Sequence, residues 1–387
     1  MRIALVAHGI HFRGGMERNF AELARALCQE HEVHLFTAEA DDVPENQVTT
    51  HLIPVVHKPL LAKFLQFYVK SSKMLARRDF DIVHTIGGIT ARQNVVTAQY
   101  CQYAWGHAIA QEPGAAEGVT AYHQMMWRLT GFFEKRAINS QHTKAVSANS
   151  RRTKEDLQTF YGTHPSKISV IYNGVDPKRF TPNNNTQRPA VRQRYGINRD
   201  VLLLLFVGEY RRKGLANVIR ALGLLQRPDV HLLAVGRGDH ALFSTLADSA
   251  GVSAQVTFAG PTTDIECVFG AADAFVFPTL YEPFGMVITE AMASGLPVLT
   301  SRRAGAAEMI EDGVNGLLLD NPGDTQELAQ KLEIMLSKSF CRSDVGIRGS
   351  QSVSHYDWTQ VADETMVLYR QVVQERQQER VPKQAIL

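Results

Sequence analysis

Two glutamates eight residues apart, Glu282 and Glu290, flank a tight turn and the start of an apolar helical pattern. The turn holds Pro283 and Gly285 and follows a short apolar run that is typical of a buried strand. A helix that begins here would offer free backbone N–H groups and the positive end of its dipole to a phosphate. Glu290 would then lie inside the helix, where its carboxylate could accept hydrogen bonds from two ribose hydroxyls. By themselves, two such glutamates are more often an acidic first turn and a solvated side chain.

A basic pair, Arg212 and Lys213, follows another apolar run that ends at Gly208. Cations fixed at such a turn could stabilise the charge of a diphosphate leaving group, although a basic pair alone is usually just an exposed turn. A third candidate is the Gly14-Gly15 step after the first apolar run. A bare Gly-Gly step is weak evidence, but backbone amides at the start of a helix can contact an anion. This position therefore favours a contact with a donor diphosphate or with an acceptor.

The elements that must position these residues form two similar halves. Apolar runs alternate with helical patterns over residues 1–180 and again over 190–355, which predicts an α/β protein with two Rossmann-like, doubly wound parallel sheets. Residues 176–189 carry three prolines and three consecutive asparagines, which favours an exposed linker. We expect the two domains to face each other across a cleft, with ligands at the carboxyl ends of the strands. Residues 356–387 form a C-terminal helix and tail that could pack back on the N-terminal domain.

The composition fits a globular protein of two domains. Hydrophobic residues make up 44% and charged residues 21% of the 387 residues. No stretch approaches 18 apolar residues, and the four cysteines are far apart, which fits a protein of the reducing cytoplasm without a structural zinc site. Residues 1–180 contain 21 Lys and Arg against 16 Asp and Glu, which predicts an anionic partner for this half. Because no basic run is interleaved with aromatic residues, a membrane surface or a phosphorylated acceptor is favoured and no nucleic acid is expected.

The string from Tyr281 to Val298 resembles the Glu-x7-Glu motif of retaining family-4 glycosyltransferases, which have the GT-B fold of two facing Rossmann domains. The resemblance extends over about residues 3–335 and rests on motifs in the family's order and spacing. These motifs are Gly14-Gly15-Met16-Glu17, Val146-Ser147 with Asn149-Ser150, Val170–Asp176, Phe206-Val207-Gly208 with Arg212-Lys213-Gly214, and Gly313-x-Asn315-Gly316.

The resemblance implies that residues 1–180 bind the acceptor and residues 190–355 bind the nucleotide-sugar donor, and it implies roles for the residues above. Glu282 would lie beside the donor sugar, Glu290 would bind the nucleotide ribose, and the Arg212–Lys213 pair would neutralise the diphosphate. No metal and no cofactor are expected, since the nucleotide-sugar is itself a substrate. Family frequency suggests that the nucleoside is uridine, and its base should lie near the two glycine turns at Gly236 and Gly260. The other donor-binding residues that the resemblance implies are Gly14, Gly15, Phe284, Gly285 and Asn173.

Two positions depart from the family pattern. Glu209 stands where many relatives carry arginine, so Arg211 and Arg212 could hold the phosphate in a slightly different geometry. Gln99 stands where family members commonly place a histidine that contacts the donor sugar. A glutamine can hydrogen-bond a sugar hydroxyl but cannot take a proton. Activity need not be lost, because in this class the leaving-group phosphate is thought to act as the base. His107 could substitute, although a lone histidine is more often structural.

The segment Lys58–Arg78 has the pattern of an amphipathic helix with a basic face. A Rossmann helix that packs on its sheet explains the apolar stripe, but not why nearly every charge in the segment is positive. A basic outer face would suit reversible docking on anionic lipid, at the cytoplasmic face of the inner membrane. The basic residues of this face are Lys63, Lys70, Lys73 and Arg77, and the apolar residues of the other face are Leu61, Phe64, Leu65, Tyr68 and Leu75.

The spacing in Phe12–Asn19 and the short turn Gly208–Gly214 also look like those of the lipopolysaccharide-core glucosyltransferases of Gram-negative bacteria. This looser resemblance implies UDP-glucose as donor and a phosphorylated heptose on a lipid-anchored acceptor. We therefore expect a retaining hexosyltransferase that moves glucose to a hydroxyl of a glycan or glycolipid. One alternative is a nucleotide-sugar epimerase on the same fold. Such an enzyme needs acid and base residues in the cleft, and Gln99 cannot serve as one. The other alternative is a non-catalytic nucleotide-sugar-binding protein.

Overall fold

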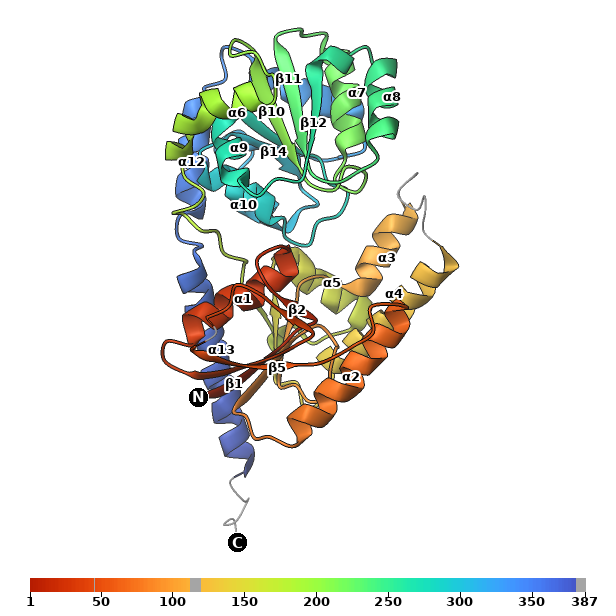
Figure 1. Cartoon of the computed structure of the whole chain (residues 1–387), viewed down its shortest axis with the longest axis vertical. Coiled ribbons are helices and arrows are strands. Elements are labelled where there is room, and N and C mark those ends of the chain that lie inside the picture. The colour runs from red at the N-terminus through yellow and green to blue at the C-terminus, as the bar shows by residue number, and fades with distance from the viewer. Residues whose placement is uncertain (45, 112–119, 381–387) are drawn as a thin grey trace. The chain divides into compact units, whose positions relative to one another are not determined.

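The chain forms two compact units, which a computed structural model describes over residues 1–44, 46–111 and 120–380. The described part of the first unit comprises residues 1–109, 120–173 and 358–380, and the second unit comprises residues 174–357. The chain therefore leaves the first unit at Asn173, before the predicted boundary at residue 180, and its last helix belongs to the first unit. Each unit has its own parallel sheet (Figure 1).

The first sheet has seven parallel strands in the order β5-β3-β1-β6-β7-β8-β9. They are β1 (Arg2–Val6), β3 (Glu32–Thr37), β5 (Val48–Leu52), β6 (Ile82–Ile86), β7 (Val95–Ala98), β8 (Ala145–Ala148) and β9 (Ile168–Val170). The short strands β2 (Gly9–Ile10) and β4 (Glu39–Ala40) pair with each other separately. From β1 the chain first adds strands on one side, as far as β5, and then adds β6 on the other side. The strand order therefore reverses between β1 and β6.

Helices cover this sheet. In the described residues they are α1 (Gly15–Leu27), α2 (Leu60–Ala76), α3 (Gln102–Gln111), α4 (Ala121–Ile138), α5 (Arg151–Tyr161) and α13 (Trp358–Arg380), with a 3-10 turn at Pro165–Lys167. The apolar face predicted for α1 is confirmed, because Phe20, Leu23, Ala24 and Leu27 are all buried. Local signals set the ends of α5. The Ser150 side chain accepts a hydrogen bond from the Thr153 N–H at its start, and Gly162 ends it in the left-handed region.

The last helix, α13, closes the first unit from the far end of the sequence and lies beside α1 (Figure 1). The hydroxyl of the buried Tyr369 is 2.6 Å from Nδ1 of His84 on β6, and Nε2 of the same ring is 2.6 Å from the Thr97 hydroxyl on β7. Burial lowers the pKa of His84 to about 3, so the ring is neutral and serves one hydroxyl as donor and the other as acceptor. At the surface, Lys144 and Glu379 form an ion pair of 2.6 Å.

The second sheet has six parallel strands in the order β12-β11-β10-β13-β14-β15. They are β10 (Leu202–Val207), β11 (Val230–Val235), β12 (Val256–Gly260), β13 (Ala274–Phe277), β14 (Val298–Ser301) and β15 (Leu317–Leu319). Its helices are α6 (Arg188–Arg194), α7 (Leu215–Leu225), α8 (His240–Ser249), α9 (Ile265–Ala271), α10 (Met286–Ala293), α11 (Thr325–Leu336) and α12 (Arg342–Val353), with 3-10 turns η2 (Pro182–Gln187), η3 (Ser253–Gln255) and η4 (Gly305–Met309). Here the order reverses between β10 and β13. The predicted pair of Rossmann-like parallel sheets is confirmed.

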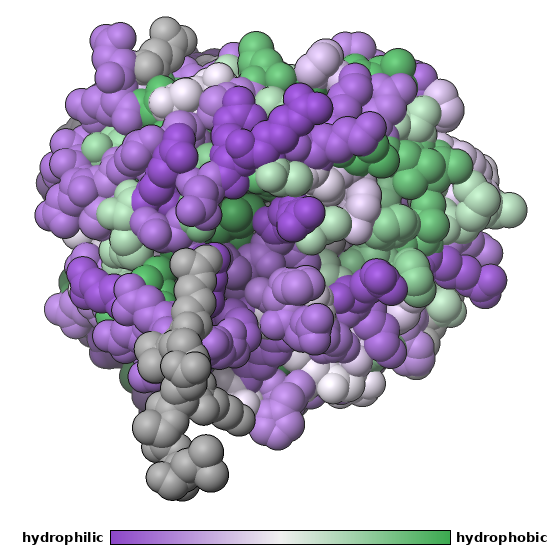
Figure 2. All heavy atoms as spheres, turned by 90° about the horizontal axis from the view of Figure 1, so that it is seen from below, coloured by the Kyte–Doolittle hydropathy of each residue, from purple (hydrophilic) through white to green (hydrophobic). Residues whose placement is uncertain are grey.

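Helices α2 and α4 pack on each other through aromatic rings. The Phe133 ring of α4 lies 5.2 Å from that of Phe64 and 4.8 Å from that of Tyr68 on α2. Outside this contact, six large hydrophobic side chains of the two helices remain between 37% and 54% exposed: Leu60, Leu65, Val69, Tyr122, Met125 and Phe132. We call them the α2–α4 surface. In Figure 2, hydrophobic side chains gather on the right of the face seen from below, the side on which Figure 1 shows α2 and α4. No described helix is long and apolar enough to cross a membrane.

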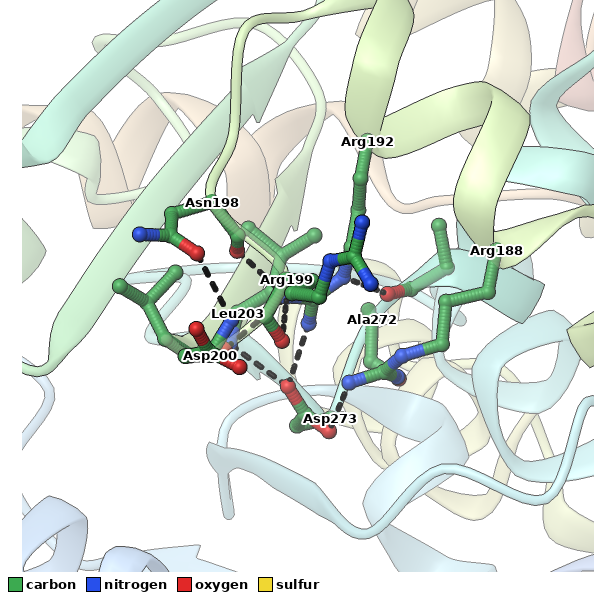
Figure 3. Close-up of polar contacts among 10 residues, drawn as sticks. Arg188, Arg192, Asn198, Arg199, Asp200, Leu203, Ala272 and Asp273 are labelled. Carbon is green, nitrogen blue, oxygen red and sulfur yellow. Dashed lines mark hydrogen bonds and ion pairs between the residues drawn. The ribbon is translucent and has the colours of Figure 1, made fainter.

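The segment predicted as an exposed linker, 176–189, contains η2 and the first two residues of α6, and both elements contact α9. Asp273 ties this segment to the sheet (Figure 3), because it accepts hydrogen bonds from Arg188 at 2.6 Å, from Arg192 at 2.8 Å and from the Leu203 N–H at 2.7 Å. Only 4% of the Arg192 side chain is exposed. Its other hydrogen bonds reach the carbonyl oxygens of Asn198, Arg199, Val201 and Ala271. Residues 176–189 are thus mostly exposed, as predicted, but 182–187 form a 3-10 turn, and a buried charge network anchors the helix that follows.

Removal of the Asp273 carboxylate should destabilise the second unit strongly, because it leaves the buried Arg192 guanidinium without its counter-charge. We expect Asp273→Ala to lower the free energy of unfolding by about 3–5 kcal/mol, as measured by urea denaturation. The control is Asp229→Ala, which breaks the 2.5 Å pair with Arg227 where the Asp229 side chain is 52% exposed. That change should cost less than about 1 kcal/mol. Equal effects of the two substitutions would contradict the buried-network account.

Candidate active site

Ligands of doubly wound sheets bind outside the carboxyl ends of the strands, where the strand order reverses. In the second sheet this point lies between β10 and β13. The turn after β10 carries Lys213, and the segment after β13 carries Glu282. Lys213 Nζ and Glu282 Oε2 form an ion pair, and each side chain is 15% exposed. Two residues predicted from separate motifs are therefore in direct contact.

Neighbouring backbone fixes the Glu282 segment. The Gly305 N–H donates to the Glu282 carbonyl at 2.9 Å, and the Ala306 N–H donates to the Phe284 carbonyl at 2.7 Å. On the other side of the pair, Lys213 Nζ lies 5.7 Å from the centre of the Phe277 ring at the end of β13. The ion pair is thus held from both sides at the carboxyl ends of the two central strands.

Glu209, the residue that departs from the family pattern, closes the turn after β10. Its carboxylate accepts hydrogen bonds from the backbone N–H of Arg211 at 3.3 Å and of Arg212 at 2.8 Å. It also accepts from Nε of Arg212 at 3.2 Å, while 52% of the Arg212 side chain stays exposed. The glutamate therefore orients Arg212 within the turn and leaves its guanidinium accessible to an anion.

The glycine turns beside the pair touch one another through their backbones. A side-chain carbon at Gly236 would lie 1.9 Å from the carbonyl oxygen of Gly208, and one at Gly214 would lie 2.3 Å from that of Pro278. The Gly236 N–H donates to the Gly260 carbonyl at 2.9 Å. Close packing alone explains why Gly214 and Gly236 lack side chains. The presence of these glycines is therefore no evidence for contact with a nucleobase.

Helix α10 begins at Gly285, which has a φ of +95° and leaves the first N–H groups of the helix without a side-chain cap. Glu290 lies on this helix and is 7% exposed. The ring of Phe284 is 2% exposed and belongs to the core, so only its backbone can contact a donor. The predicted turn, helix start and internal glutamate are present as a continuous unit.

The first sheet has a pocket of about 210 Å³ at its own reversal point, between the ends of β1 and β6. The residues that give it polar character come from four turns and helices. They are His8 after β1, Gln99 after β7, Glu17 on α1, and Thr130 and Glu134 on α4. Burial and the nearby Lys63 lower the pKa of His8 to about 4, which keeps its ring neutral.

Glu134 is a buried carboxyl, 7% exposed, in the wall of this pocket. Its Oε2 accepts hydrogen bonds from the Tyr161 hydroxyl and, at 3.0 Å, from the Gln102 N–H. Burial raises the pKa of Glu134 to about 7, against the opposite effect of these two hydrogen bonds. A carboxyl that titrates near neutral pH beside a pocket is a functional candidate.

Gln99 belongs to a buried network of amides. Its Oε1 accepts from Asn149 at 3.1 Å and from Asn173 at 3.3 Å, and Asn149 also donates to the Gln99 backbone carbonyl at 2.8 Å. Asn173 in turn accepts from Asn19 at 3.0 Å. The two predicted site residues Gln99 and Asn173 are therefore neighbours, and their hydrogen bonds hold the end of β7 in place.

At the start of α1, Gly14 is the N-cap and Gly15 the first helical residue. A side-chain carbon at Gly14 would lie 2.2 Å from Oε2 of Glu17. A carboxylate of the chain itself thus occupies the space beside the Gly14-Gly15 step, where an anionic ligand was predicted. His107, weighed as a substitute for Gln99, is not among the described residues that line the pocket. Its ring instead lies 5.5 Å from Phe160.

Sequence reasoning assigned no role to Glu134, His8, Glu17 or Asn149. Glu134 carried a usable signal, because it is the one acidic residue in a stretch, 121–138, whose other charges are basic. A single acid among apolar and basic residues of a helix points to burial or function. Glu17 and Asn149 belong to motifs of the family resemblance but received no role of their own, and His8 carries no comparable pattern.

Family models match each unit separately. The model described as Glycosyltransferase Family 4 matches residues 13–179, and the model described as Glycosyl transferases group 1 matches residues 187–351. With its two Rossmann-like parallel sheets, the chain belongs to the family-4 glycosyltransferases of the GT-B fold.

Its relatives include lipopolysaccharide-core enzymes, to which it is loosely similar. The lipopolysaccharide glucosyltransferase WaaG of Escherichia coli is 26% identical over 353 residues, which cover 90% of this chain and 91% of that protein. An uncharacterized glycosyltransferase of Methanocaldococcus jannaschii is 27% identical over 394 residues, covering 96% and 98%. The crystal structure of WaaG, a glycosyltransferase involved in lipopolysaccharide biosynthesis, matches with a TM-score of 0.79 and 25% identity over 95% of this chain and 99% of that one.

The raised pKa of Glu134 predicts a pH dependence of stability. The folded protein keeps this proton up to about pH 7, whereas the unfolded chain releases it near the ordinary pKa of 4.5. The contribution of Glu134 is therefore full below about pH 4.5 and is lost as the pH rises through about 7. Glu134→Gln should flatten the fall of the melting temperature between about pH 5 and 8. The exposed Glu155→Gln on α5 is the control and should keep the wild-type slope. An unchanged slope in Glu134→Gln would disprove the assignment.

Proposed function

We propose that this protein is a retaining, metal-independent glucosyltransferase that moves glucose from UDP-glucose to a hydroxyl of a glycan or glycolipid. The observation that carries the proposal is the Lys213–Glu282 ion pair at the reversal point of the second sheet. It combines a cation for a leaving diphosphate with a carboxylate for the donor sugar at the place where doubly wound sheets bind nucleotides. The relationship to a lipopolysaccharide glucosyltransferase supports glucose as the sugar and a lipopolysaccharide core as the acceptor.

In the proposed reaction, the bond between the anomeric carbon and the diphosphate oxygen breaks, and its electron pair stays on the diphosphate. The acceptor oxygen attacks the same face of the sugar, and its proton passes to the departing phosphate oxygen. Negative charge thus grows on the diphosphate as the bond breaks. Lys213, Arg212 and the uncapped N–H groups at the start of α10 are the fixed groups that stabilise this charge.

The remaining residues of the proposed donor site lie on α10, in the segment before it and at two glycine turns. The buried Glu290 accepts hydrogen bonds from the ribose hydroxyls, and the Glu282 carboxylate exchanges part of its contact with Lys213 for the donor glucose. Backbone groups at the turns of Gly236 and Gly260 contact the uracil. We choose uridine over other nucleosides because uridine donors are frequent in the family.

The Arg212→Ala, Lys213→Ala double variant tests the proposal. Because both cations act on the leaving group, the turnover of UDP-glucose should fall by about 10²-fold or more, as measured by UDP release. Wild-type turnover should persist in EDTA, and the transferred glucose should keep its α configuration by NMR. The control is Arg220→Ala with Lys338→Ala, two exposed cations of the second unit, which should leave turnover unchanged. Full activity of the Arg212, Lys213 variant would refute this site.

We also propose that the α2–α4 surface docks on a membrane that contains anionic lipid. Its six side chains offer exposed apolar groups for the acyl–headgroup boundary. Seven basic residues accompany them on or beside the two helices: Lys63, Lys70, Lys73, Arg77, Arg128, Lys135 and Arg136. The single acidic residue of α2 and α4 is Glu134, which is buried. Charge complementarity therefore favours an anionic lipid surface over a protein partner of mixed charge.

Vesicles of phosphatidylglycerol test the docking surface. Leu65→Gln, Val69→Gln and Phe132→Gln together should weaken binding at least about tenfold, since the apolar insertion is lost. Replacing the basic residues Lys63, Lys70, Lys73 and Arg77 by Gln should do the same and remove the salt dependence. The matched control changes three equally exposed residues of the second unit, Leu224, Ile334 and Ile347, to Gln. Sedimentation that is unaffected by the α2–α4 changes would rule this surface out.

A further inference from the structure

The pocket of the first unit contains polar atoms that lack partners within the protein. Glu134 receives both of its hydrogen bonds on Oε2, and among the described residues none reaches its Oε1. Nδ1 of His8, which lines the same pocket, is buried without a hydrogen-bond partner among the described residues. Buried polar atoms are normally paired, so this nitrogen, together with the Glu134 Oε1 that is open to the pocket, indicates that a ligand completes both.

The turn after β6 keeps Oε1 of Glu134 open to the pocket. A side-chain carbon at Gly88 would lie 2.4 Å from the Phe133 carbonyl oxygen, so this turn packs directly on the backbone of α4. A side-chain carbon at Gly87 would lie 3.5 Å from Oε1 of Glu134, in ordinary contact, and would cover it. The absence of side chains at both positions brings the helix close and leaves its carboxylate uncovered.

The charges of the pocket are one-sided. Glu17 and Glu134 contribute two carboxyl groups to the wall, of which Glu134 is a carboxylate above about pH 7, and no lysine or arginine is among the described residues that line it. The one histidine of the wall, His8, is neutral because it is buried and lies near Lys63. A phosphate inside the pocket would meet two acceptor groups and no cation, whereas hydroxyl groups can donate to both carboxylates.

The size and the apolar part of the wall point to one ring. A volume of about 210 Å³ lies below the range of about 300–1,000 Å³ that small-molecule sites usually have. Phe64, Ile86 and Ile89 supply apolar wall that can cover the C–H face of a sugar or cyclitol. The pocket therefore suits a single hydroxylated ring and not an extended chain.

We propose that this pocket binds one uncharged, hydroxyl-rich ring of the acceptor, and that Glu134 selects it by accepting a hydrogen bond from a ring hydroxyl. Glu17 and His8 bind further hydroxyls, and the two carboxylates together repel a ring that carries phosphate. Any phosphate of the acceptor lies outside the pocket. This inference rests on the proposed glycosyl transfer, and it differs from the phosphorylated heptose that the sequence resemblance implied for this position.

Ring binding is measurable on the full-length protein at about pH 8, where Glu134 is ionised, with UDP present to occupy the donor site. We choose two matched pairs of probes, myo-inositol with its monophosphate and a methyl mannoside with its 6-phosphate, and titrate each by saturation-transfer NMR. At least one neutral ring should bind, and its phosphate ester should bind at least about tenfold more weakly. Glu134→Gln should weaken binding of the neutral ring about tenfold, because a charge-assisted hydrogen bond is lost. The control Glu155→Gln should leave both values unchanged.

Glu17→Gln keeps the test independent of the folding of the Glu134 variant. It removes one carboxylate from the partly exposed rim of the pocket. The ratio between the dissociation constants of the phosphate ester and the neutral ring should therefore decrease. Tighter binding of the phosphate esters, or no binding of either neutral ring, would overturn the proposal. The proposal would also be overturned if Glu134→Gln and Glu17→Gln both left the preference for the neutral ring over its phosphate ester unchanged. UDP-glucose hydrolysis is measured in parallel, and its absence with intact ring binding would count against the transferase proposal alone.

Discussion

The arrangement of this protein depends on one topological constraint, the reversal of strand order in each parallel sheet. Where the order reverses, the chains that leave two neighbouring strands turn to opposite faces of the sheet, and the space between their ends stays open. In the first unit this space between β1 and β6 holds the pocket with Glu134. In the second unit the corresponding space between β10 and β13 holds the Lys213–Glu282 pair. The same geometry thus places a pocket lined by two carboxyl groups on one sheet and a lysine–glutamate ion pair on the other.

Local patterns in the sequence sufficed for the fold and for the donor half of the site. The alternation of strand-like and helical patterns predicted the two sheets, and the spacing of apolar residues in α1 predicted which of its faces is buried. Lys213 and Glu282 could be predicted together because each follows a strand and both strands lie at the centre of one sheet. Such features depend on the order of elements along the chain and on turn chemistry, which a sequence carries directly.

The pocket of the first unit depends on contacts that no local pattern records. Gln99 is fixed by Asn149 and Asn173, which lie 50 and 74 positions further along the chain. Glu134 is buried by the turn after β6 and by Tyr161 of another helix, so its burial could not be derived from α4 alone. The predicted linker is exposed over most of its length, but its 3-10 turn could not be predicted for the same reason. The helix that follows is anchored by Arg192, whose buried partner, Asp273, lies 81 positions further along the chain.

Helix α13 has a consequence for the biosynthesis of the protein. The first unit needs residues 358–380, since Tyr369 completes the hydrogen bonds of His84 in the middle of its sheet. A ribosome releases residues 1–173 first, yet this unit can reach its final state only after the entire second unit has been made. The second unit is contiguous and can fold while synthesis continues. The two units therefore mature in the reverse of the order in which they begin along the chain, and a nascent chain exposes the unfinished first sheet until residues 358–380 have been made.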